Sequence, residues 1–247
     1  MTLEFLFVLL VGALAGGFLN GLAGFGTALL ALGFWLQVMQ PHQAVGIVVI
    51  MSVASGLQGL WITRREIRDR PGRLARFLVP GLIGLPLGIS LLGMISVPFL
   101  KLTIAGFMIV YGGFFTLRRA LPRFERPTPV IDSSIGFIGG VLGGAASLSG
   151  ALPTMWCAMR PWPKNETRAV LQPYNVTILG TAVVIFAFQG VYDRPTLILT
   201  ALALPATLIG SQLGIMLFHR LDDTQFRRLL IGIMFASGIL LTIREVI

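Results

Sequence analysis

The sequence predicts an all-α polytopic integral membrane protein made of two inverted repeats. Of its 247 residues, 55% are hydrophobic and only 12% are charged, whereas soluble globular domains carry about 25% charged residues. Several apolar stretches approach the length of a bilayer-spanning helix, which takes about 20 residues. Glycine-rich segments interrupt two of these stretches, and the surrounding pattern recurs in the second half of the chain.

The first apolar stretch, 3–39, is too long for one membrane crossing. As a straight helix it would measure roughly 55 Å, against a hydrocarbon core of roughly 30 Å. The segment 20–27, Asn-Gly-Leu-Ala-Gly-Phe-Gly-Thr, contains three glycines, so we expect the run to break there. Backbone groups released by a break at membrane depth must line a polar cavity or be buried in protein.

The first repeat is expected to cover residues 1–117. After the broken run come spans at 43–63, 77–95 and 99–117, with an arginine-rich loop at 64–76 between the first two. We interpret the basic, proline-rich segment 118–132 as a cytoplasmic connector.

The second repeat is expected at 133–247 and follows the same plan. An apolar run over 131–159 carries its own small-residue break at 143–150, and three spans follow at 169–189, 196–218 and 229–243. Each repeat then holds a glycine-broken helix pair and three transmembrane helices, or about eight to ten membrane segments in total.

Matching residues at fixed spacing indicate a duplication. At an offset of 124, four glycines of the first half coincide with four of the second, as Gly12/Gly136, Gly16/Gly140, Gly26/Gly150 and Gly56/Gly180. At an offset of 126, ten positions match between 84–118 and 210–244. Internal repeats are common in transporter folds.

The distribution of positive charges predicts how the repeats are oriented. If each broken run turns back within the membrane, 16 of the 19 Lys and Arg lie on one side, and only Lys101, Arg194 and Arg244 on the other. If each run crosses once, the division is 12 against 7. The positive-inside rule favours the first arrangement. Each half then crosses an odd number of times, so the halves are inverted and both termini lie outside.

Composition argues against several other functions. The net charge is +9, but the basic residues lie in short loops, which is typical of the positive-inside rule rather than of nucleic-acid binding. Cys157 is the only cysteine, and His42 and His219 lie far apart, so we expect neither a metal nor another cofactor. We find no Ser/His/Asp set and no paired carboxylates, so we do not expect an enzyme.

The residues expected at membrane depth are neutral, which directs attention to the helix ends. The helices after the breaks, 27–39 and 151–159, would begin near the bilayer middle. A helix N-terminus presents free amides and about half a positive charge, so two of them facing each other would hold an oxyanion without lysine or arginine. The alternative is that these glycines and serines only allow close helix packing. The substrate-binding residues we predict are Asn20, Gly24, Phe25, Gly26, Thr27, Ser147, Ser149, Gly150, Gln172 and Asn175.

Two glycine-rich motifs and a short polar one carry a family resemblance. They are Gly-Gly-Phe-Leu-Asn-Gly-Leu-Ala-Gly-Phe-Gly at 16–26, Gly-Gly-Val-Leu-Gly-Gly-Ala-Ala-Ser-Leu-Ser-Gly-Ala-Leu-Pro at 139–153 and Asn-Glu-Thr-Arg-Ala at 165–169. With the two-repeat layout, they resemble the TauE/SafE family of sulfite exporter-like permeases. The resemblance implies export of sulfite, sulfoacetate or a related small sulfur anion across a bacterial inner membrane.

We therefore expect a transporter of a small anion in the lipid bilayer, working by alternating access or gated export. One alternative is a transporter of another small solute or a metal cation, although hard divalent cations favour carboxylate ligands. A second is a non-transporting scaffold or accessory subunit, which would not need paired breaks. The sequence leaves the coupling ion and the oligomeric state open, a homo-oligomer included.

Overall fold

The computed structural model describes residues 2–62, 64–69, 71–94 and 124–226, with single positions between 96 and 113 and between 228 and 239. Within these residues the chain is helical and contains no strand, which confirms the predicted all-α class. Among the described residues, six helices are long and apolar enough to cross a membrane. They are α1 (Leu3–Ala23), α3 (Pro41–Ile62), α5 (Pro71–Leu92), α7 (Pro129–Ala146), α9 (Lys164–Phe188) and α10 (Arg194–Arg220). The predicted spans at 99–117 and 229–243 lie mostly outside the described residues.

Three shorter helices complete the described fold. They are α2 (Thr27–Trp35), α4 (Arg64–Asp69) and α8 (Ala151–Ala158). Each broken run is therefore one full-length helix followed by a short one. Because α4 and the start of α5 occupy most of 64–76, the expected arginine-rich loop is largely helical. Helix α7 begins at Pro129, inside the expected connector, and proline suits the first turn of a helix.

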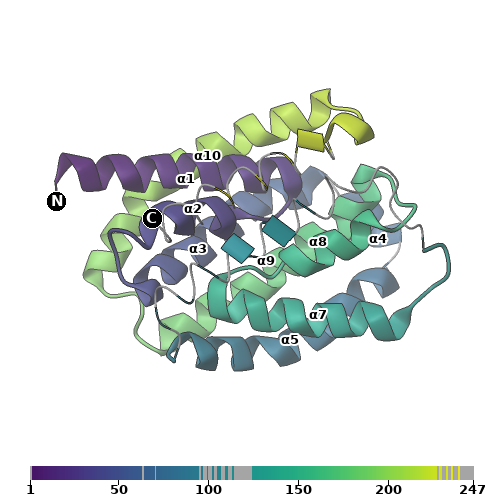
Figure 1. Cartoon of the computed structure of the whole chain (residues 1–247), viewed down its shortest axis with the longest axis horizontal. Helices are drawn as coiled ribbons and strands as arrows, with labels where there is room; N and C mark the ends of the chain where they lie inside the picture. Colours follow the sequence, from purple (N-terminus) through teal and green to yellow (C-terminus); the bar gives the residue numbers. More distant parts are fainter. Residues whose placement is uncertain are drawn as a thin grey trace.

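Two long helix pairs each join the halves of the chain (Figure 1). Helix α1 lies along α10, and α5 lies along α7. A Cβ atom on Gly21 would overlap the carbonyl oxygen of Ser211, and one on Gly88 would overlap that of Val141. No side chain fits between these backbones, so the glycines here serve close helix packing. Helices α3 and α9 lie between the pairs. They are the most buried of the six spans, because 61% and 67% of the residues in their most apolar 18-residue stretch are buried.

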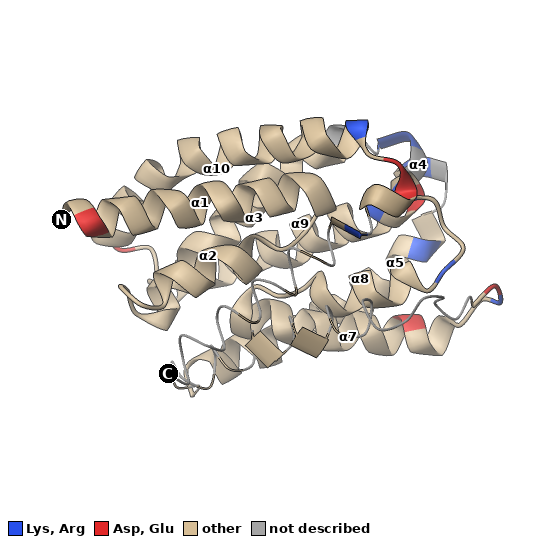
Figure 2. Ribbon diagram, turned by 45° about the horizontal axis from the view of Figure 1, so that its top comes forward, with Lys and Arg blue, Asp and Glu red and all other residues tan. Residues whose placement is uncertain are grey.

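One end of the bundle carries most of the described positive charge, and we call it the basic end (Figure 2). Here the starts of α5 and α9 meet in an Arg73–Glu166 ion pair of 2.7 Å. The start of α9 also meets the end of α1, because Arg168 Nη2 donates to the Gly21 carbonyl oxygen at 2.8 Å. The positive-inside rule predicts that this end faces the cytoplasm.

The first helices of the two halves run in opposite directions. Helix α1 runs toward the basic end, where Gly21 bonds to Arg168, whereas α7 begins at that end, with Asp132 lying 3.9 Å from Arg76 of α5. The N-terminus of α1 lies at the opposite end of the bundle (Figure 2). The inverted relation of the complete halves stays a prediction, because much of 95–123 and 227–247, including the C-terminus, lies outside the described residues.

Candidate functional site

The first break is a three-residue turn between α1 and α2. Gly24 caps α1 with φ +82°, and its amide donates to the Asn20 carbonyl oxygen at 2.7 Å. Gly26 follows with φ +100°. Both values lie in the left-handed region that side chains other than glycine rarely adopt. The two glycines thus reverse the chain, and α2 runs back along α1, with Trp35 Nε1 donating to the Leu9 carbonyl oxygen at 3.1 Å.

The second break, between α7 and α8, uses a serine where the first uses glycine. Ser147 has φ +57°. Its amide donates to the Gly143 carbonyl oxygen at 2.9 Å, and the next amide, that of Leu148, donates to Leu142 at 3.1 Å. The bond from Ser147 is that of the αL motif, in which a left-handed residue directly after the helix bonds to the carbonyl four positions earlier. Helix α8 then begins at Ala151 and returns along α7.

Helices α2 and α8 begin alongside α1 and α7, at positions before the ends of these longer helices. Helix α1 has 21 residues and is about 31 Å long, close to the hydrocarbon thickness. A Cβ atom on Gly16 would lie 2.8 Å from the Thr27 carbonyl oxygen, which places the start of α2 about 10 Å before the end of α1. Ser149 likewise lies beside Gly143, where an added Cβ would be 2.9 Å from the serine Cβ.

The two breaks come into contact with each other. A Cβ atom on Gly150, directly before α8, would lie 2.5 Å from the Phe25 Cβ and 2.9 Å from its Cγ. Phe25 is the residue between the two left-handed glycines of the first break and is buried. The structure therefore brings Phe25, Gly26, Thr27 and Gly150 together although more than 120 positions separate the two segments.

The predicted polar residues divide between the two breaks and the helices around them. Asn20 Nδ2 donates to the Ser52 carbonyl oxygen at 3.1 Å and to Ser55 Oγ, which joins α1 to α3. Ser149 Oγ donates to Asn175 Oδ1, which joins the second break to α9.

Gln172 reaches the first break from α9. Its Nε2 donates to the Gly56 carbonyl oxygen at 3.0 Å. A Cβ on Gly24 would lie 2.8 Å from Gln172 Oε1. All ten predicted residues therefore lie at one of the breaks or contact a residue of a break.

Within the part of the chain that the structure describes, several buried polar atoms around the breaks have no hydrogen-bond partner. They are Asn20 Oδ1, Thr27 Oγ1, Ser147 Oγ and Gln172 Oε1. An unpaired buried polar group is costly, and native structures leave few of them. Two are hydroxyls, at Thr27 and Ser147, which can donate to an anion. With the free amides of two helix starts, they make a polar site that a bound solute would complete.

Arg168 is the residue that the sequence analysis missed. It was counted among the loop bases, yet it lies in the second turn of α9 and is 2% exposed. Besides its bond to Gly21, the guanidinium stacks on Phe218, 4.4 Å from the ring centroid. Its Nε and Nη1 find no hydrogen-bond partner among the described residues. The available signal was its place in the Asn-Glu-Thr-Arg-Ala motif, directly before the apolar part of a span.

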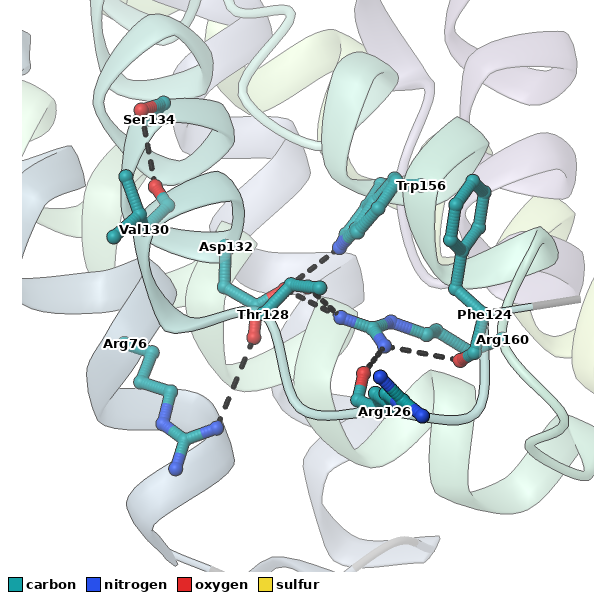
Figure 3. A network of polar contacts seen from close by, with 9 residues as sticks. All are labelled: Arg76, Phe124, Arg126, Thr128, Val130, Asp132, Ser134, Trp156 and Arg160. Carbon is teal, nitrogen blue, oxygen red and sulfur yellow. Dashed lines mark hydrogen bonds and ion pairs between the residues drawn. The ribbon is translucent and has the colours of Figure 1, made fainter.

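A buried polar network fixes the far end of α8 to the start of α7 (Figure 3). Asp132 Oδ1 accepts from Trp156 Nε1 at 2.7 Å and pairs with Arg160 Nη2 at 3.0 Å. Arg160 Nη1 also donates to the carbonyl oxygens of Phe124 and Arg126, at 3.0 and 2.6 Å. The network therefore holds the C-terminal end of α8, and the N-terminal end of this helix is the one that faces the first break.

Comparison with known proteins gives one match. The profile of the sulfite exporter TauE/SafE family matches residues 8–241 of the chain, a range that includes both breaks and all nine helices except the first turns of α1. A search of curated proteins finds no match, and no solved structure matches either.

Proposed function

The chain belongs to the sulfite exporter TauE/SafE family, and from this premise we propose that it exports sulfite or a related small sulfur oxyanion or organosulfonate. The family is one of membrane transporters, and six apolar helices suit a multi-pass membrane protein. The substrate, the site and the direction of transport are the parts that we propose.

The meeting of the two breaks is the observation that carries this proposal. Phe25 of the first break lies against Gly150 of the second, so the starts of α2 and α8 lie close together. Each helix start has amides without an intrahelical partner and a partial positive charge. The buried hydroxyls of Thr27 and Ser147 add donors without partners. This donor-rich, neutral environment suits an anion with several oxygen atoms.

The breaks also suggest how access alternates between the two sides. Helix α1 runs toward the basic end, and α7 runs away from it, so the two hairpins enter the bundle from opposite sides and their turns meet between its two ends. We propose that each hairpin covers the site from its own side. A small movement of one hairpin relative to its flanking helices would then open one side at a time, as in other transporters with broken helices.

Transport in proteoliposomes tests the proposal. We expect the purified protein to carry sulfite or another sulfur oxyanion from a panel that also holds thiosulfate, sulfoacetate and sulfate, with and without a pH gradient. Gly26→Val and Gly150→Val should abolish transport while insertion stays normal, because both crowd the helix starts. Gly180→Ala is the control, since the nearest atom to its new Cβ is Val53 Cγ2 at 4.0 Å. Wild-type anion affinity in both valine variants would show that the anion does not bind at the breaks. Transport of a cation but of no anion would show that the proposed substrate class is wrong.

A further inference from the structure

A cavity lies at the basic end of the bundle, next to the end of α1. It is enclosed by the end of α1, by α8, by the start of α9 and by residues 223–226 after α10, and its volume is about 90 Å³. A single water needs about 10–15 Å³ of such space, so the cavity has room for a small oxyanion. The polar or charged side chains that line it belong to Thr154, Lys164, Thr167, Arg168 and Asp223.

Arg168 differs from the other buried or half-buried bases at this end in its partners. Arg160 pairs with Asp132, and Arg73 pairs with Glu166. Lys164 Nζ donates to the carbonyl oxygens of Phe218 and Leu221 at the end of α10. Arg168 donates to the Gly21 carbonyl oxygen and stacks on the Phe218 ring, and no carboxylate of the described residues pairs with it. A buried charge without a counter-charge is unfavourable, so a bound anion would stabilise it.

Two residues that line the cavity, Arg168 and Thr154, also contact residues of the breaks. The Arg168 side chain passes the first break, because a Cβ on Gly24 would lie 3.5 Å from its Cγ. Thr154 on the facing wall donates through Oγ1 to the Gly150 carbonyl oxygen at 2.6 Å. An anion held in the cavity would therefore lie near the end of α1 and the first turn of α8.

We propose that this cavity is an anion-binding vestibule on the cytoplasmic side of the breaks, with Arg168 as its ligand for the transported oxyanion. The inference rests on the proposed function and extends it to a second subsite. Nε and Nη1 supply N–H donors, and a charged donor forms stronger hydrogen bonds to an oxyanion than a neutral one. Lys164 and Arg168 against the exposed Asp223 leave one net positive charge in the lining. The anion would bind here first and then pass to the neutral site between the breaks.

Thermal unfolding of the purified protein in detergent, with and without anion, tests this vestibule. Sulfite, thiosulfate, sulfoacetate and sulfate are the probes, with chloride as the reference salt at equal ionic strength. Wild type should gain Tm with at least one sulfur anion, and Arg168→Met should lose that gain. The Tm of Arg168→Met without anion should equal or exceed that of wild type, since the variant removes an uncompensated buried charge. Arg168→Lys should keep the charge and raise the apparent Kd more than tenfold.

A matched control separates this local role from the general effect of charge at the basic end. Arg220→Gln removes one positive charge from an exposed position at the end of α10, and it should keep the wild-type anion response. If Arg168→Met retains the anion-dependent gain in Tm and the wild-type KM for transport, the vestibule is refuted while the proposed function stands. A lower Tm without anion but an unchanged gain would assign Arg168 a structural role. If wild type neither binds nor carries any of the anions, the proposed function itself is refuted.

Discussion

Substitution of Gly150 by alanine is a direct test of the contact between the two breaks. The new Cβ would lie 2.5 Å from Phe25 Cβ, 2.9 Å from Cγ and 3.2 Å from Cδ2. The nearest of these atoms is the Phe25 Cβ, which cannot move by side-chain rotation alone. Gly150 itself has φ −80°, which suits alanine, so the backbone adds no strain. The cost therefore arises from the contact across the two breaks.

Overpacking of this kind costs about 1–3 kcal/mol, and we expect that loss for Gly150→Ala in equilibrium unfolding in mixed micelles. Gly180→Ala provides the matched comparison. Its Cβ meets only Val53 Cγ2 at 4.0 Å, and alanine in a helix interior is favoured over glycine by roughly 0.5–1 kcal/mol, so this variant should be as stable as wild type or more so.

A double-mutant cycle with Phe25→Ala isolates the contact. Removing the ring while keeping the Cβ relieves the overlaps with Cγ and Cδ2 and frees the first break to shift. The loss of unfolding free energy in the double variant should therefore be smaller than the sum of the two single losses, by about 1 kcal/mol or more. A coupling of this size is typical of residues in contact. Additive losses within about 0.5 kcal/mol would mean that the Phe25 ring does not contact residue 150, and the proposed site would lose much of its support.

Three further predictions concern the charge at the site, the network at α8 and the topology. Thr27→Asp should impair transport more than Thr27→Asn at equal expression, because a fixed negative charge repels an anion strongly in a medium of low dielectric constant; equal activities would place the anion away from α2. Asp132→Ala should destabilise the protein by about 3–5 kcal/mol, since Arg160 then remains buried without its carboxylate. Adding Arg160→Met should recover part of the lost Tm, whereas a further fall would contradict this account. Reporter fusions after residues 68, 122 and 164 should report the cytoplasm and a C-terminal fusion the outside; an external residue 164 would refute the predicted inversion.

The sequence alone was sufficient for the membrane class, the family resemblance and the positions of the breaks. Apolar length predicts spans because every backbone polar group must be bonded within the membrane. Glycine predicts the first break because only glycine readily adopts the positive φ found at Gly24 and Gly26. The second break was also placed correctly, although its left-handed residue is Ser147, a type that sequence rules favour less.

Three-dimensional packing decided which residues act together, since contacts between distant segments leave no local signal. Gly21 and Gly88 proved to be packing glycines because another helix's backbone passes them, while Gly150 lies against the ring of Phe25. The same reasoning explains Arg168. In the sequence it is one of several bases near a span, and the charge count treats them all alike. Only the tertiary structure buries Arg168 beside the first break, with no carboxylate of the described residues paired to it, and pairs Arg160 with Asp132. Burial and partners depend on which helices meet.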